Sequence, residues 1–281
     1  MSITPDALLT MRSGKYTYLL KLLNIYILNN LSYYMPNFWN IVNRVINDAD
    51  VLVMVLDARM IAETRNIEIE NKIQRLKKPL IYVLNKSDLV DENTLMKLKK
   101  SVSNSVFLSA KLHQGTNKLR EKIMIAASRM KKERVKVGIL GYPNVGKSSV
   151  INALKGSAAA KTSSISGYTK GVQKINTSKM MLLDTPGVIP YKEKDNLKHN
   201  MIGTIDYSKE KDPDVVVMQL MKQFPGVIEE YYDVKISKNT QTTLNAIAKK
   251  KLMLKKGSEL DIIRTATMIL KAFQNGKIKI N

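Results

Sequence analysis

The chain has 281 residues, which is long enough for one or two domains with a sizeable core. Its 46 lysines and arginines against 24 acidic residues leave a formal net charge of +22, so we expect a polyanionic partner, with RNA first and an anionic membrane surface as the alternative. The chain has no cysteine and two histidines, which excludes disulfides and cysteine–metal sites and leaves little for a histidine-based one.

The N-terminal segment, residues 1–35, is expected to be helical. Residues 16–35 are rich in Leu, Ile and Tyr, but Lys21 and three asparagines interrupt them. Because a membrane-spanning helix needs ~20 mostly apolar residues, we interpret this stretch as an amphipathic helix packed on the protein, with a membrane element as the alternative. No cleavable signal is evident, so we expect a cytoplasmic protein without stable membrane association.

Short apolar runs alternate with segments of helical periodicity as far as about residue 204. The predicted strands are 51–56, 80–84, 105–108, 135–140, 172–176 and 180–183, and the predicted helices are 37–48, 67–76, 119–130, 147–155, one starting at Asp212-Pro213, 244–254 and 259–273. Such alternation is typical of a three-layer α/β domain with a mostly parallel sheet.

We therefore expect an α/β domain over residues 36–204 and a small helical domain over residues 205–281, where the strand signal fades. Within the second domain, residues 231–281 hold 11 Lys or Arg and three acidic residues, a net charge of +8. A basic helical domain is suited to binding RNA phosphates, and that binding should weaken steeply with salt. The basic runs proposed for phosphate contact are Lys131-Lys132 with Arg134, Lys249-Lys250-Lys251 and Lys255-Lys256.

Two short polar motifs directly follow the second and third predicted strands. Asn85-Lys86-Ser87-Asp88 comes first and Ser109-Ala110-Lys111 comes second. The Asp88 carboxylate would accept hydrogen bonds from N1–H and N2–H₂ of guanine, whereas adenine offers no such donor pair. The Lys86 stem would cover the base face, Asn85 would brace neighbouring loops, and the N–H of Ala110 would meet guanine O6.

The fourth predicted strand leads into residues 141–148, which match the phosphate-loop pattern G-x-x-x-x-G-K-S. The glycines let backbone N–H groups face phosphate oxygens, Lys147 would reach the β and γ phosphates, and Ser148 would bind Mg²⁺. The helix after the loop adds its positive N-terminal end. This motif stands between a strand and a helix, which is the context that the function requires.

Asp184-Thr185-Pro186-Gly187 follows the last predicted strand. The Asp184 carboxylate would hold Mg²⁺ through water, and Gly187 would offer its N–H to the γ-phosphate. The small, polar loop 156–171 suits a mobile switch, and we predict that the Thr169 hydroxyl completes the Mg²⁺ shell, with Thr162 as the alternative.

Together the motifs predict a GTP site. The predicted nucleotide-binding residues are Asn85, Lys86, Asp88, Ser109, Ala110, Lys111, Asn144, Val145, Gly146, Lys147, Ser148, Ser149, Thr169 and Gly187. In an ordinary GTPase the phosphate loop comes first and the base-reading motifs follow, whereas here the same motifs occur in a rotated order with the base-reading motifs first. The four motifs can close one site only if the P-loop fold is circularly permuted. An ATPase is the least favoured interpretation because of Asp88.

These features resemble the circularly permuted GTPases of the YlqF/RbgA type, ribosome-assembly factors that act on the large subunit. The likeness also rests on Asp57-Ala58-Arg59 followed by Arg65-Asn66, and on an ending with Ile269-Leu270 and Gly276-Lys277-Ile278. It implies GTP hydrolysis with Mg²⁺, a C-terminal helical RNA-binding domain, and association with the large ribosomal subunit and its rRNA. We expect a monomer that cycles between GTP and GDP.

The chain departs from that family at two points. Ile61 stands where the family usually has proline, which puts the conformation of that loop in question. Some relatives carry an N-terminal histidine proposed to help catalysis, but this chain has no histidine before His113. Arg59 and Arg65 are expected to make structural or signalling contacts on the guanine-binding half.

The position after D-x-x-G, where many GTPases carry a water-orienting glutamine, is Val188. We therefore expect turnover to be slow without a partner, with Lys147, Thr169, Gly187 and Asn144 as the catalytic residues. In potassium-stimulated GTPases an asparagine placed like Asn144 helps to hold K⁺ beside the phosphates, so we predict potassium stimulation. The alternatives are a slow-hydrolysing, nucleotide-regulated RNA-binding placeholder and a membrane-surface GTPase.

Overall fold

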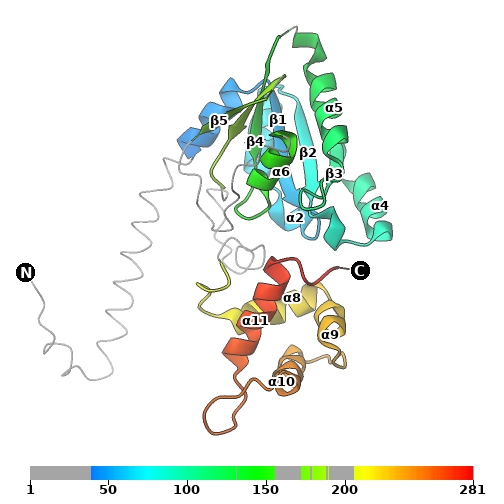
Figure 1. Ribbon diagram of the computed structural model, residues 1–281, viewed down its shortest axis with the longest axis vertical. Helices are drawn as coiled ribbons and strands as arrows, with labels where there is room; N and C mark the ends of the chain where they lie inside the picture. The colour runs from blue at the N-terminus through cyan, green and yellow to red at the C-terminus, as the bar shows by residue number, and fades with distance from the viewer. Residues whose placement is uncertain are drawn as a thin grey trace, which may run out of the picture.

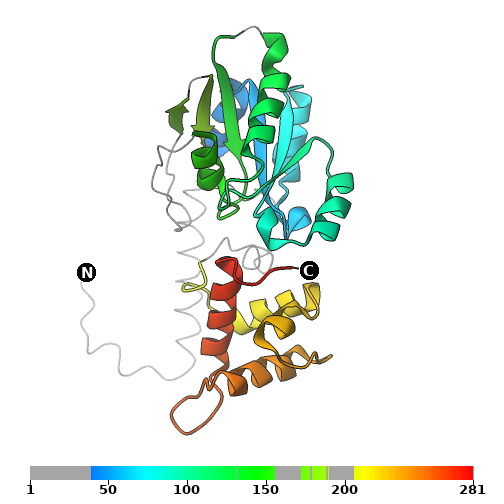
Figure 2. The same ribbon diagram turned by 45° about the vertical axis from the view of Figure 1, so that its right-hand side comes forward.

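The computed structural model describes residues 39–130, 132–155, 172–177, 179–187, 189 and 206–280. The described residues form a twisted sheet flanked by helices and a separate group of helices (Figures 1 and 2). This group lies at the end of the sheet domain where the parallel strands finish. The predicted three-layer α/β fold is confirmed.

The described sheet has six strands in the order β3-β2-β1-β4-β6-β5. Neighbouring strands are parallel, except that β5 pairs antiparallel with β6. The strands are β1 (Val51–Asp57), β2 (Leu80–Asn85), β3 (Ser105–Leu108), β4 (Val135–Leu140), β5 (Gln173–Asn176) and β6 (Met180–Asp184).

The strand order reverses between β1 and β4. From β1 the chain proceeds outward to β2 and β3, whereas from β4 it proceeds the other way to β5 and β6. Open α/β sheets bind ligands beside the carboxyl ends of such a strand pair. This topology therefore makes the carboxyl ends of β1, β2, β4 and β6 the expected place for a ligand.

Hydrophobic residues fill both sides of the sheet because alternate side chains of each strand point to opposite faces. Val51, Val53 and Val55 pack in one core with α5 and α6, whereas the intervening residues of β1 pack with α3 and with the helical residues 39–48. The elements between the strands are α2 (Ile61–Thr64), α3 (Ile67–Arg75), η2 (Ser87–Leu89), α4 (Glu92–Ser101), α5 (Thr116–Ala127), η3 (Ser128–Met130) and α6 (Lys147–Lys155).

The C-terminal helices pack on one another and continue the first of these cores. Phe273 and Ile269 of the last helix are fully buried there with Leu220 and Leu244 of two others. The helices are α8 (Pro213–Gln223), α9 (Val227–Tyr232), α10 (Thr240–Lys250) and α11 (Ile262–Gln274).

Most predicted elements are confirmed, with shifted ends. The helix predicted over 244–254 instead begins at Thr240, where Asn239 caps the Gln241 N–H, and it ends at Lys250. Leu252 has a φ of 52°, which a right-handed helix cannot accommodate. Asp212 does precede α8 with Pro213 in its first turn, but the Asp212 side chain makes no capping hydrogen bond.

Several predictions fall outside the described residues: the N-terminal segment 1–35, the loop residues Thr162 and Thr169, Val188 and Lys131. The proposed domain boundary at 204/205 adjoins the undescribed stretch 190–205 and stays a prediction. Within the described parts of the chain, no helix is long and apolar enough to cross a membrane.

Candidate functional site

The phosphate-loop motif folds as a tight connection between β4 and α6. Gly141 and Gly146 have φ values of 146° and 96°, which favour glycine, and Asn144 has a φ of 59°. A side chain at Gly146 would place its Cβ 2.2 Å from Asn85 Nδ2, so the loop approaches the end of β2 closely. The sequence therefore needs glycine here for both conformation and space.

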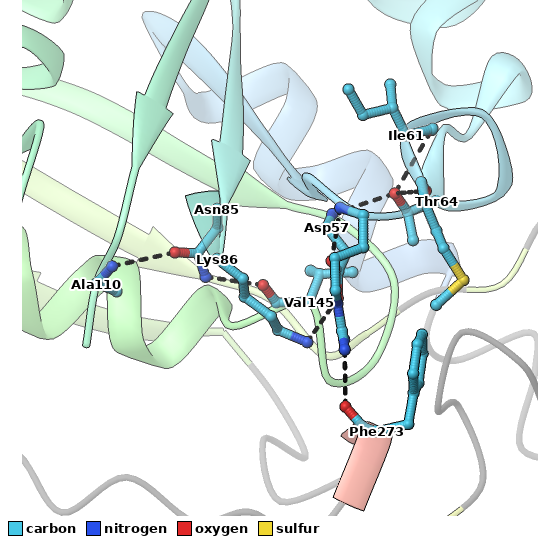
Figure 3. A network of polar contacts seen from close by, with 10 residues as sticks. Asp57, Ile61, Thr64, Asn85, Lys86, Ala110, Val145 and Phe273 are labelled. Carbon is cyan, nitrogen blue, oxygen red and sulfur yellow. Dashed lines mark hydrogen bonds and ion pairs between the residues drawn. The ribbon is translucent and has the colours of Figure 1, made fainter. Parts of the chain in front are cut away.

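Asn85 connects three loops that are distant in the sequence. Its Nδ2 donates to the Val145 carbonyl of the phosphate loop at 2.9 Å, across 60 residues, and its Oδ1 accepts from the Ala110 N–H at 3.2 Å (Figure 3). Asn85 is 3% exposed, so these bonds are shielded from water. The bracing role predicted for Asn85 is what the structure displays. The Ala110 N–H, predicted to face guanine O6, here donates to Asn85.

Asp88 and Ser109 lie together on the same side of the site. The Ser109 hydroxyl donates to Asp88 Oδ1 at 2.6 Å and also accepts from the N–H of Leu112 at 3.2 Å. The hydroxyl therefore fixes the orientation of the carboxylate. Asp88 is half-buried, Ala110 is buried and Lys111 is exposed, so the Asp88 carboxylate lies at a partly open surface.

Lys147, at the start of α6, is 8% exposed and directed at the phosphate loop. Its ammonium donates to the carbonyls of Gly141 at 3.2 Å and Tyr142 at 2.7 Å. Burial lowers the Lys147 pKa to about 8, although the Asp184 charge acts in the opposite direction. A buried cation whose ammonium donates to neutral carbonyls is well prepared for an anion.

The D-x-x-G turn lies against the phosphate loop. Thr185 Oγ1 donates to the Ile139 carbonyl of β4 at 2.7 Å. A Cβ on Gly187 would lie 2.6 Å from the backbone nitrogen of Pro143, so the two loops touch through their backbones. Gly187 therefore lies directly against the phosphate loop.

A magnesium ion fits the oxygen atoms of this site. Ser148 is exposed at the first turn of α6, and the Asp184 carboxylate is 4% exposed at the end of β6. Mg²⁺ typically takes one or two protein oxygens together with phosphate and water, so these two residues would suffice. No cluster of three or more acidic or histidine ligands occurs among the described residues.

Two charged residues, Asp57 and Arg59, lie beside Lys86. Neither was predicted from the sequence to belong to the nucleotide site. Lys86 Nζ donates to Asp57 Oδ2 at 2.7 Å, and Arg59 forms a two-point ion pair with the same carboxylate. The only sequence signal for this group was the Asp57-Ala58-Arg59 stretch at the end of a strand. Arg65, by contrast, pairs with Glu70 and lies over the Tyr82 ring, as expected of a structural residue.

The Lys147 pKa predicts a pH dependence of phosphate binding. Above pH 8 the empty site holds a neutral lysine, and binding a phosphate must then recharge it. We expect GDP affinity to be nearly constant from pH 6.5 to 7.5 and to fall above pH 8, by up to about tenfold per pH unit. Calorimetry at pH 8.5 in two buffers of different ionisation enthalpy should reveal proton uptake, and its absence, with unchanged affinity, would contradict the assignment.

The sequence of this chain matches two GTPase families. The RsgA GTPase family matches residues 43–192, and the family described as 50S ribosome-binding GTPase matches residues 136–256. An uncharacterised GTP-binding protein of Methanocaldococcus jannaschii is 43% identical over 244 residues, covering 85% of this chain and 65% of that protein. Nucleolar GTP-binding protein 2 of Saccharomyces cerevisiae is 32% identical over 251 residues, covering 85% of this chain and 52% of the relative.

Solved structures show the same fold. A GDP-bound YlqF structure superimposes with a TM-score of 0.60 at 23% identity, covering 85% of this chain and 96% of that one. A GNP-bound YlqF from T. maritima gives 0.57 at 23% identity, with coverages of 85% and 95%. The chain therefore spans nearly all of the YlqF structures, but 65% or less of the two curated relatives described above.

Proposed function

This chain belongs to the RsgA GTPase family and has a circularly permuted GTPase fold, and on that premise we propose that it binds and hydrolyses GTP during assembly of the large ribosomal subunit. The observation that carries the proposal is the double hydrogen bond of Asn85 to Val145 and Ala110. It joins the phosphate loop to the two guanine-reading motifs in spite of their permuted order, which produces one site from three separate segments.

Within this site each residue has a distinct task. Asp88 recognises the guanine edge, the Lys86 stem covers the base, and the phosphate-loop N–H groups with Lys147 bind the phosphates. Mg²⁺ would be held by Ser148 and, through water, by Asp184, and it would neutralise charge that develops on the phosphates. Gly187 and Thr169 would respond to the γ-phosphate.

We propose that the basic helical region contacts rRNA. Its lysines are exposed on α10 and the segments around it, and Lys235, Lys249 and Lys250 line one hollow between α10 and residues 234–237. In this region lysines and arginines exceed acidic residues by eight over 231–281. Such a surface binds phosphates by displacing counterions, whatever the base sequence.

The proposal is tested by GTP turnover in KCl and in NaCl, with and without purified large ribosomal subunits. We expect slow turnover by the chain alone, because Val188 cannot orient water, and strong stimulation by the particles. Turnover in KCl should exceed turnover in NaCl by about tenfold, since a bound cation would stabilise transition-state charge.

Asn144→Gly provides the matched variant for the potassium effect. Asn144 has a φ of 59°, so glycine removes the side chain without backbone strain. The variant should lose the difference between the two salts, and its GDP affinity, measured in parallel, separates this loss from a general weakening of nucleotide binding. Equal turnover rates of the unaltered chain in KCl and NaCl would contradict the proposed potassium site. Intact GTP binding without stimulation of turnover by ribosomal particles would favour the RNA-binding placeholder.

A further inference from the structure

Arg59 joins the GTPase domain to the last turn of α11. Its Nη1 donates to the Phe273 carbonyl at 2.7 Å, and its guanidinium lies 4.4 Å from the centre of the Phe273 ring. The Arg59 side chain is 2% exposed and Phe273 is 1% exposed. A cation at the carboxyl end of a helix is favoured by the helix dipole, and shielding from water strengthens that attraction. The contact is thus part of the buried structure between the two regions.

The same guanidinium is held by Asp57 through two further bonds. Arg59 Nε donates to Asp57 Oδ1 at 3.0 Å and Nη2 donates to Oδ2 at 2.8 Å, while Lys86 Nζ donates to Oδ2 at 2.7 Å. Burial opposes ionisation of Asp57, but the charges of Arg59 and Lys86 outweigh it and hold the Asp57 pKa well below its usual range. Because one carboxylate serves both cations, moving either cation disturbs the other.

Lys86 is the point where this chain of contacts meets the nucleotide site. It directly follows Asn85 and lies two residues before Asp88, and a φ of 62° turns its side chain out of the strand direction. Figure 3 shows the Lys86 side chain running from the end of β2 toward Asp57, with Phe273 beyond. If its stem carries the guanine ring, Lys86 connects the ring to Asp57, and Arg59 connects Asp57 to α11.

The C-terminal residues hold the same loop a second time. The Ile280 N–H donates to the Leu89 carbonyl at 2.8 Å, and the Ile280 carbonyl accepts from the Asp91 N–H at 3.1 Å. Gly276 also lies against Leu89, since a Cβ at that position would be 2.9 Å from the Leu89 side chain. The residues that follow α11 therefore attach to the segment just after Asp88.

We propose that Asp57 and Arg59 are positioning residues that couple guanine binding at Lys86 to docking of the C-terminal helices through Phe273. The inference rests on the proposed function, because it requires guanine over Lys86. Coupling between two sites is reciprocal, so docked helices strengthen guanine binding to the same degree. GTP and GDP carry the same base, so both should have the same effect on the C-terminal helices. The contacts from Lys86 to Phe273 therefore respond to whether a nucleotide is bound, and not to how many phosphates it carries.

The test is amide hydrogen exchange of the full chain, alone and with Mg²⁺ plus either GDP or a non-hydrolysable GTP analogue. The amides of Asn275, Gly276 and Lys277 bond to α11 carbonyls and report its last turn. We expect both nucleotides to slow their exchange to the same extent, by about fivefold or more. Unchanged exchange there, with slowed exchange in the phosphate loop, would overturn the proposal even before any variant is made.

Arg59→Lys keeps the charge, but a single ammonium lacks the planar fork that reaches both Asp57 oxygens and the Phe273 carbonyl together. We expect it to lose the α11 response and to bind GDP about fivefold or more weakly. The control is Gln223→Ala, which removes another bond between the two regions, Gln223 Nε2 to Glu63 Oε1 at 2.7 Å, without touching Lys86. That variant should keep the response, and a response retained in Arg59→Lys would contradict the coupling. If GDP protects neither the phosphate loop nor α11, the proposed function fails, and this inference fails with it.

Discussion

Replacing Asp88 with asparagine is expected to change the base preference from guanine to xanthine. The carboxylate accepts from two guanine donors, whereas an amide offers one N–H to the xanthine 2-oxygen and cannot accept from both donors. Losing charged hydrogen bonds worth about 1.5–3 kcal/mol each should weaken GDP binding by roughly 100-fold or more. Xanthosine diphosphate should become the better ligand. The Ser109 hydroxyl, 2.6 Å from Asp88 Oδ1, can still orient the new amide.

Asp91→Asn is the matched control for this variant. Asp91 lies three residues further on and caps α4 by accepting from the Thr94 N–H at 3.0 Å. Asparagine caps helices as well as aspartate does, so stability and GDP binding should stay within about twofold of the unaltered chain. Competition titrations with GDP and xanthosine diphosphate decide the matter. If Asp88→Asn binds neither base better than the other, Asp88 does not read the base edge.

Gly146→Ala should abolish nucleotide binding through its effect on Asn85. The new Cβ would lie 2.2 Å from Asn85 Nδ2, the atom that bonds to the Val145 carbonyl. Relief of this overlap must displace Asn85 or the phosphate loop, which separates the two halves of the site. We expect GDP affinity to fall by roughly 100-fold or more, since the phosphate and base contacts both depend on this junction.

Gly257→Ala separates backbone strain from this steric effect. Gly257 has a φ of 95°, almost equal to the 96° of Gly146, but nothing lies within 4 Å of its added Cβ. Both alanines therefore incur similar strain of about 1–2 kcal/mol. The thermal unfolding temperature should be lowered in both variants, whereas GDP binding should be lost only in Gly146→Ala. Equal GDP affinity in the two variants would show that Asn85 does not hold the site together.

The sequence was sufficient to predict the strands and the ligand loops because each has a strong local signal. The run from Val51 to Leu56 is apolar on both faces, as a central parallel strand requires, and each ligand motif follows such a run. The helix α4 was not predicted: its apolar residues Leu95 and Leu98 pack against the core but stay partly buried, and charged or polar residues fill most of its ten positions.

The contact between Arg59 and α11 could not be predicted from the sequence. It joins residues 214 positions apart, and neither the Asp57-Ala58-Arg59 stretch nor the end of α11 indicates a partner. The D-x-x-G turn precedes the C-terminal helices along the chain, but much of the connecting chain, 190–205, lies outside the described residues. The contacts that are described reach the base-reading half, through Arg59, Glu63 and Leu89.

The central claim is that the permuted motifs close one guanine-nucleotide site. Equilibrium binding of GDP and ADP to the full chain with Mg²⁺ tests it most directly. We predict that GDP binds at least about 100-fold more tightly than ADP, since Asp88 would find no donor pair on adenine. Equal affinity for the two nucleotides, or no binding of either, would contradict the account.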